Sequence, residues 1–116
     1  SSKEIFDGRT SRINKSAYSS LKKVGQALAT TSYRVFVEGH VSKNLFEGSG
    51  FSSDRSMAAE RATVLVRYFE KVHKIDPNRM ASLSYGSVKP IIRQNSNQLW
   101  RNDRIDILVA TEDFPL

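Results

Sequence analysis

Arg61 is the residue whose type and position most clearly suggest chemistry. It lies on or beside the apolar side of a helical pattern over residues 54–74, which contains neither glycine nor proline. Small residues surround it, so its guanidinium is expected to point toward the body of the domain. Two interpretations remain open. The side chain either carries its charge along an apolar stem to water or to an internal ion pair, or it binds a ligand near the start of the helix.

A second polar group lies at the end of a predicted strand over residues 33–40. Glu38 and His40 are two residues apart, so they share one face of that strand at its carboxyl end. Open α/β sheets often place ligand sites there. A Glu-x-His pair alone is weak evidence for a metal, and a hydrogen-bonded structural pair is the ordinary interpretation. We therefore predict neither a metal site nor a hydrolase built on Glu38, His40 and Asp54, because no nucleophile with an orienting base can be named.

The helix that carries Arg61 is the longest uninterrupted helical pattern in the sequence. Its predicted inner stripe recurs every three or four residues and consists of Met57, Arg61, Leu65, Tyr68, Phe69 and Val72. Ser52, Ser53 and Asp54 are candidate N-caps. An earlier helix is predicted over about residues 14–30, and Gly25 weakens its middle by about 1 kcal/mol relative to alanine. Its inner side is predicted to consist of Ile13, Ala17, Leu21, Val24 and Leu28.

Strand patterns occur before, between and after these helices. A brief strand is predicted around residues 4–8, the clearest strand over residues 33–40, and a closing strand over residues 104–110. In the closing strand, Ile105, Ile107 and Val109 share one face. Residues 81–86 alternate, which predicts a strand whose inward side chains are Ala81, Leu83 and Tyr85. Residues 41–53 are predicted to form a loop, residues 95–101 a short helix or loop, and residues 111–116 a tail.

The resulting order is (β)αβαββ. It predicts a two-layer sandwich in the α/β (α+β) class. Two main helices would pack on one side of a small mixed sheet. The 116 residues are expected to form a single domain, residues 1–116, with a core of about residues 4–110. Cysteine is absent, which excludes disulfides and thiolate zinc sites. No run approaches the roughly 20 apolar residues that a membrane span requires.

The net charge of +6 favours a polyanionic neighbour, such as nucleic acid, anionic lipid or an acidic cell-wall polymer. The basic residues are scattered, and no basic stripe with stacking aromatic residues is evident. Nucleic-acid binding is therefore a minor alternative, and we expect no nucleic-acid partner.

Five motifs occur in a fixed order and spacing. They are Val35-Phe-Val-Glu-Gly-His40, Met57-Ala-Ala-Glu-Arg-Ala-Thr-Val64, Lys74-Ile-Asp-Pro-Asn-Arg-Met80, Tyr85-Gly-Ser-Val-Lys-Pro90 and Asn102-Asp-Arg-Ile-Asp-Ile107. Together they resemble the OmpA-like peptidoglycan-binding domain, and most of all its flagellar-stator version, the periplasmic part of MotB. The resemblance extends over about residues 4–109.

This resemblance implies a non-catalytic, cofactor-free domain that anchors a periplasmic protein to peptidoglycan. The full-length protein would be attached to the inner membrane, would form a homodimer, and would meet its stator partner through a membrane segment outside this chain. In the family, the pocket lies between the loop after the Gly-His strand and the start of the central helix. An aspartate of a Thr-Asp pair takes the ammonium group of the stem peptide's diamino acid, and the helix arginine takes its carboxylate.

Carried over by position, the family's helix arginine matches Arg61, and the first and third residues of its terminal Asn-Arg-Arg triplet match Asn102 and Arg104. The Thr-Asp aspartate is replaced by Ser42, and the middle arginine of the triplet by Asp103. The resemblance therefore gives five candidate peptidoglycan-binding residues, namely Ser42, Asp54, Arg61, Asn102 and Arg104.

Asp54 is included because it lies two turns before Arg61, roughly 10 Å along the same helix face, and could supply a carboxylate from a different corner. Losing a charged partner typically costs about 2–5 kcal/mol of binding free energy, so the expected peptidoglycan affinity is reduced. The main alternative is a degenerate pocket on the same scaffold, acting as a dimerisation or protein-docking module.

Overall fold

The computed structural model describes residues 4–90 and 102–110. Its helices and strands are η1 (Lys15–Ala17), α1 (Tyr18–Ala29), β1 (Arg34–His40), α2 (Asp54–His73), η2 (Pro77–Arg79), β2 (Met80–Gly86) and β3 (Arg104–Ala110). Each main helix and the last three predicted strands are thus found within a few residues of their expected bounds. The predictions for residues 91–101 and 111–116 lie outside the described residues. Within the described part of the chain, no helix is both long and apolar enough to cross a membrane.

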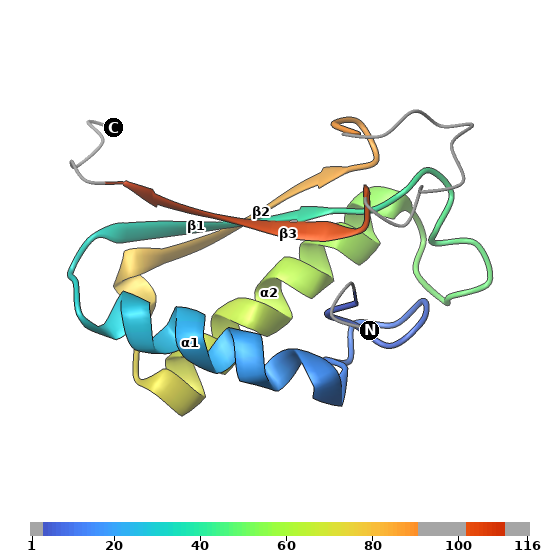
Figure 1. Ribbon diagram of the computed structural model, residues 1–116. Coiled ribbons are helices and arrows are strands. Elements are labelled where there is room, and N and C mark those ends of the chain that lie inside the picture. Colours follow the sequence, from blue (N-terminus) through green and yellow to red (C-terminus); the bar gives the residue numbers. More distant parts are fainter. Residues whose placement is uncertain (1–3, 91–101, 111–116) are drawn as a thin grey trace.

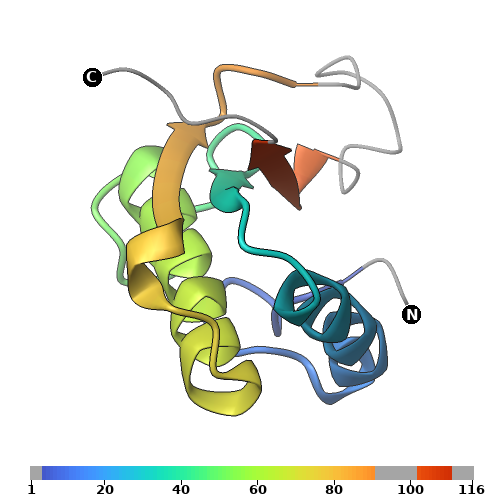
Figure 2. The same ribbon diagram turned by 90° about the vertical axis from the view of Figure 1, so that its left-hand side faces the viewer.

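The three strands form one mixed sheet in the order β2-β1-β3. The central strand β1 runs parallel to β2 and antiparallel to β3. Both helices lie on the same side of this sheet (Figure 1), and the end view separates the two layers, with α1 and α2 side by side beneath the strands (Figure 2). The predicted α+β two-layer sandwich is therefore confirmed.

The predicted first strand around residues 4–8 is wrong as a member of the sheet. Phe6 forms only an isolated antiparallel bridge with Ile13. The backbone hydrogen bonds nearby, such as Asn14 N–H to Ile5 O at 2.7 Å, stay within the segment. We call residues 5–14 the N-terminal hairpin. Backbone N–H and C=O groups of the hairpin are hydrogen-bonded within the segment, so it does not need to pair with the sheet.

A close approach of α2 to the sheet sets the shape of the layer between them. A side-chain carbon at Gly39, on the helix-facing side of β1, would lie 2.1 Å from the backbone oxygen of Ala58. No larger residue fits this position without moving the helix. The flanking positions Val35 and Val37 face the same layer and are completely buried.

The predicted inner face of β2 is wrong. Val37 pairs with Ser82 in the ladder, so Ser82 and Ser84 face α2 while Ala81 and Leu83 face outward, and Leu83 is 39% exposed. The reason is again the closeness of α2. Ser84 Oγ donates a hydrogen bond to the backbone oxygen of Arg55 at 2.7 Å, a contact that only a small polar side chain can make here.

The core lies between the sheet and the two helices. On α2 the buried residues are Met57, Ala58, Arg61, Ala62, Leu65 and Phe69. Val72, predicted to belong to this stripe, is 60% exposed. A helix of 20 residues is about 30 Å long, whereas a strand of seven residues is about 23 Å long, so the last turn of α2 extends past the sheet. That turn instead contacts α1. The closeness shows at Gly25, where a side-chain carbon would lie 2.4 Å from the ring of His73.

The start of α2 is fixed by a capping box. Ser53 Oγ accepts a hydrogen bond from Ser56 N–H at 3.0 Å, and Ser56 Oγ accepts one from Ser53 N–H at 3.2 Å. We expect Ser53→Ala to lower the free energy of unfolding by about 1 kcal/mol. Urea denaturation measures this. Ser32→Ala, at an exposed position before β1, is the control and should change stability by less than about 0.5 kcal/mol.

Candidate functional site

The candidate ligand-binding residues come from segments that meet at one end of the sheet. His40 at the end of β1 pairs with Arg104 at the start of β3, and Val41 N–H donates to Gly86 O at the end of β2. The N-terminus of α2 and the N-terminal hairpin lie at the same end (Figure 1). The loop over residues 41–53 therefore leaves β1 beside the start of the central helix, as the resemblance implied.

Arg61 points into the domain and not to water. Only 5% of its surface is exposed. Its Nε donates a hydrogen bond to Thr10 O at 2.9 Å, and its Nη2 donates one to Gly8 O at 2.9 Å. Its Cζ lies 4.8 Å from the centroid of the Phe6 ring, within cation–π range. The N-terminal hairpin, whose position sequence reasoning left undefined, is thus what holds this guanidinium in place.

The electrostatics around Arg61 involve two acids. Burial lowers the pKa of Arg61, while the nearby charges of Asp103 and Glu4 act in the opposite direction. A guanidinium remains protonated in proteins despite such a shift. Arg61 is therefore a buried cation, and Asp103 is a nearby negative charge.

Asp103 is the functional candidate that sequence reasoning missed. Its Oδ1 accepts a hydrogen bond from Ser42 N–H at 2.5 Å. Asp103 also lies close enough to Arg61 for its charge to favour the protonated guanidinium. The structure thus brings Ser42, Asp103 and Arg61 together. The sequence does contain a signal for Asp103. Relative to the family's motifs, the chain lacks an acid at residue 42 and has an additional acid at residue 103.

Asp54 accepts three hydrogen bonds from the surrounding chain. Its Oδ2 accepts hydrogen bonds from Asn44 N–H at 2.8 Å and from Ser87 Oγ at 3.1 Å, and its Oδ1 accepts one from Phe46 N–H at 3.2 Å. This carboxylate therefore ties the loop over residues 41–53 to the start of α2 and to the end of β2.

We expect Asp54→Ala to destabilise the domain by about 1–3 kcal/mol, because three donors lose an ionised acceptor. Hydrogen exchange should speed up at the amides of Asn44 and Phe46. Glu60→Ala, a carboxylate removed from the same helix, is the control and should leave both amides unchanged. Unaltered protection in the Asp54 variant would show that its carboxylate does not hold the loop.

Arg104 does not join the group around Arg61. Arg104 donates from Nε to both carboxylate oxygens of Asp106 at 3.2 Å, and from Nη1 and Nη2 to Lys89 O, also at 3.2 Å. It does so on the outer face of the sheet. The side chain of Asn102 is buried, with 1% of the residue exposed.

Glu38 and His40 share the outer face of β1, as predicted. The two are not hydrogen-bonded as a pair, because His40 Nε2 lies 3.6 Å from Glu38 Oε1. On the opposite side of the sheet, a cavity of about 220 Å³ lies between α1 and β3 and is lined mainly by apolar residues, including Leu21, Leu65 and Ile107. The lining residues include two serines, Ser16 and Ser20, and carry no charge.

The OmpA family matches the chain over residues 5–104. The uncharacterized protein YtxE of Bacillus subtilis is 24% identical over 106 residues, which are 90% of this chain and 44% of that protein. The chain therefore spans less than half the length of this relative.

Several solved structures share the fold. The periplasmic domain of Helicobacter pylori MotB is similar with a TM-score of 0.85 at 22% identity, covering 97% of this chain and 73% of that one. The cell wall anchor of the type VI secretion system of Pseudomonas aeruginosa gives 0.84 at 19% identity, covering 93% and 76%. A putative MotB-like protein from Desulfovibrio vulgaris gives 0.83 at 18% identity, covering 95% and 69%. The match to the family covers most of the sequence, from the N-terminal hairpin to the start of β3, and the chain belongs to the OmpA family.

Proposed function

We propose that this chain is a non-catalytic domain that anchors a MotB-like protein to peptidoglycan. The observation that carries the proposal is the buried Arg61 at one end of the sheet, with the carboxylate of Asp103 near enough for the two opposite charges to interact. Membership in the OmpA family and the likeness to a cell wall anchor support it.

The ligand in this proposal is the zwitterionic diamino-acid end of a stem peptide. A zwitterion is held best by a cation and an anion at fixed positions. Two of the five guanidinium N–H groups of Arg61 donate to the N-terminal hairpin, and the remaining N–H groups would bind the ligand carboxylate. Asp103, oriented by Ser42 N–H, would accept the ammonium group. In this arrangement Asp103 replaces the family's aspartate, and Asp54 orders the loop instead of binding the ligand.

The same proposal gives the domain a location and partners. We place it in the periplasm, as part of a longer protein attached to the inner membrane by a segment outside this chain. That segment would also meet the stator partner, and the domain would act as a homodimer. The likeness to the periplasmic domain of MotB supports these assignments. Because the chain spans 44% of YtxE, the activity of the whole protein is part of the proposal.

Retention on purified cell-wall sacculi tests the anchoring function. We expect the domain to sediment with intact sacculi and to remain in solution with sacculi whose stem peptides have been removed by an amidase. Equal sedimentation with both preparations would show that the glycan strands, and not the peptide, are bound. Failure to sediment with either would contradict the proposed function.

A second candidate function is favoured by one observation, a group of exposed apolar side chains on the outer face of the sheet. Leu108 on β3 pairs with Phe36 on β1, and Leu83 on β2 pairs with Glu38 on the same face; Leu83 and Leu108 are 39% and 46% exposed. A docking or dimerisation module with an inactive pocket would use such a face. Sedimentation velocity separates the two functions. A concentration-dependent dimer combined with no retention on sacculi would select the docking module.

A further inference from the structure

The most unusual polar group outside the proposed ligand site is His40. Only 3% of its surface is exposed. Neither ring nitrogen has a hydrogen-bond partner within the described residues. Tyr85 stacks on the ring, with centroids 5.2 Å apart and planes 10° apart, which fixes the ring's orientation. A buried imidazole without a hydrogen-bond partner is energetically costly, so this arrangement calls for an explanation.

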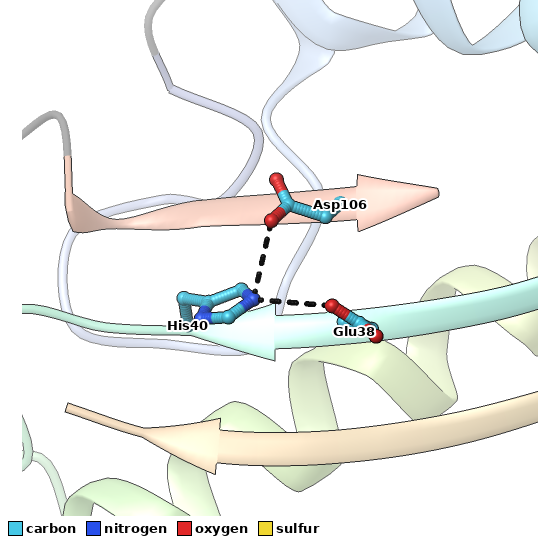
Figure 3. Close-up of side chains that lie close together, drawn as sticks. All are labelled: Glu38, His40 and Asp106. Carbon is cyan, nitrogen blue, oxygen red and sulfur yellow. Dashed lines mark ion pairs between the residues drawn. The ribbon is translucent and has the colours of Figure 1, made fainter. Parts of the chain in front are cut away.

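The ring directs Nε2 between two carboxylates, as Figure 3 shows. Asp106 Oδ2 on β3 lies 3.3 Å from Nε2, and Glu38 Oε1 on β1 lies 3.6 Å from it. One potential ligand atom from each of the three residues lies within 4.8 Å of the other two. The β1–β3 ladder pairs Glu38 with Asp106, so both carboxylates project from the outer face at the same level. Sequence alone brings together only Glu38 and His40, because the third residue comes from a strand more than 60 positions later.

We propose that Glu38, His40 and Asp106 form a binding site for a divalent transition-metal ion of the zinc class. Two ligands bound about 2.1 Å from a tetrahedral ion lie about 3.4 Å apart, which is close to the two distances observed here. Imidazole together with carboxylate oxygen is a ligand set that suits zinc better than magnesium or calcium. The ion would give Nε2 the partner that it lacks, and Nδ1 would carry the ring proton.

Burial and charge are consistent with such a site. Burial, and then the charge of Arg104, lower the pKa of His40, whereas Asp106 and Glu38 act in the opposite direction. The side chain of Asp106 is 40% exposed, which gives an ion access from solvent and leaves room for water as a fourth ligand. Arg104 opposes the ion, because its Nε donates to both oxygens of Asp106.

Titration of the chain with zinc chloride in a calorimeter tests the site. We expect a single site in the unmodified chain and at least about tenfold weaker binding in both Glu38→Gln and Asp106→Asn, which keep the side-chain shapes. His40→Gln should abolish binding. His73→Gln removes the only other histidine and is the matched control, with unchanged affinity expected. Arg104→Gln should bind zinc more tightly, because it removes the cation that shares Asp106.

The opposing results are equally defined. Absence of zinc binding by the unmodified chain would overturn the proposal. So would the same affinity in the Glu38 and Asp106 variants, or a loss of binding in the His73 variant, since either would indicate an adventitious ion on the surface. A weaker affinity in Arg104→Gln would place the ion away from Asp106. None of these readouts involves the cell wall, so this proposal and the proposed anchoring function can fail independently.

Discussion

Arg61→Lys is expected to lose retention on sacculi while the domain remains folded. Lysine keeps the charge and the apolar stem, but it cannot donate to Thr10 O and Gly8 O and also present a planar fork to a carboxylate. Removing one partner of a buried charged contact typically costs about 2–5 kcal/mol. At 1.4 kcal/mol per tenfold, the affinity for the wall should fall about 30-fold or more.

The structural part of this effect must be measured separately. The two backbone oxygens of the N-terminal hairpin would lose well-placed donors, so the free energy of unfolding should fall by about 1–3 kcal/mol. Thermal unfolding establishes a temperature at which both proteins are folded, and retention is then compared there. Arg67→Lys, on an exposed part of the same helix, is the control. A folded Arg61→Lys domain with undiminished retention would restrict Arg61 to a structural role.

Moving the acid from residue 103 to residue 42, with an arginine placed at residue 103, is expected to have the second large effect. Asp103→Arg restores the family's triplet but leaves two cations and removes the acceptor of Ser42 N–H. This single variant should lose wall binding by about the same factor as the Arg61 variant. The double variant Ser42→Asp/Asp103→Arg recreates the acid and the base at the family's positions, and it should recover retention to within about tenfold of the unmodified chain.

The rescue distinguishes a ligand-binding acid from an acid that only orders the loop. If Asp103 merely held the loop through Ser42 N–H, the double variant would remain as poor as the single one. Asp103→Asn provides the matched control, because it keeps an acceptor for Ser42 N–H while it removes the charge. Full retention by Asp103→Asn would contradict the assignment of the ammonium partner.

The main elements could be predicted because their patterns are long and uninterrupted. The central helix was expected over residues 54–74 and is observed over Asp54–His73, and the last strand was expected and observed over residues 104–110. The alternation of apolar residues predicted the wrong inner face for β2, because contact with α2 determines which side chains face the helix. Ala81 and Leu83 form the more apolar side of β2, yet Ser82 and Ser84 face the helix, where their hydroxyls form hydrogen bonds to α2.

The candidate site was predictable only in part. Arg61 was singled out from its position on an otherwise apolar helix face, and the structure places it inside the domain. Its hydrogen-bond partners in the N-terminal hairpin, and the contact between Asp103 and Ser42 across 61 positions, depend on how distant segments meet. Spacing along one helix led to Asp54, which is instead occupied by three donors from the surrounding loops.

Binding of a diaminopimelate-containing muropeptide, followed by amide chemical shifts, tests the opposite-charge site most directly. The account predicts saturable shifts at Ser42, Arg61 and Asp103, and a clear loss of affinity when the free amino group of the muropeptide is acetylated, since Asp103 would then have no ammonium to accept. Shifts confined to other parts of the sheet, or equal binding of the acetylated muropeptide, would contradict it.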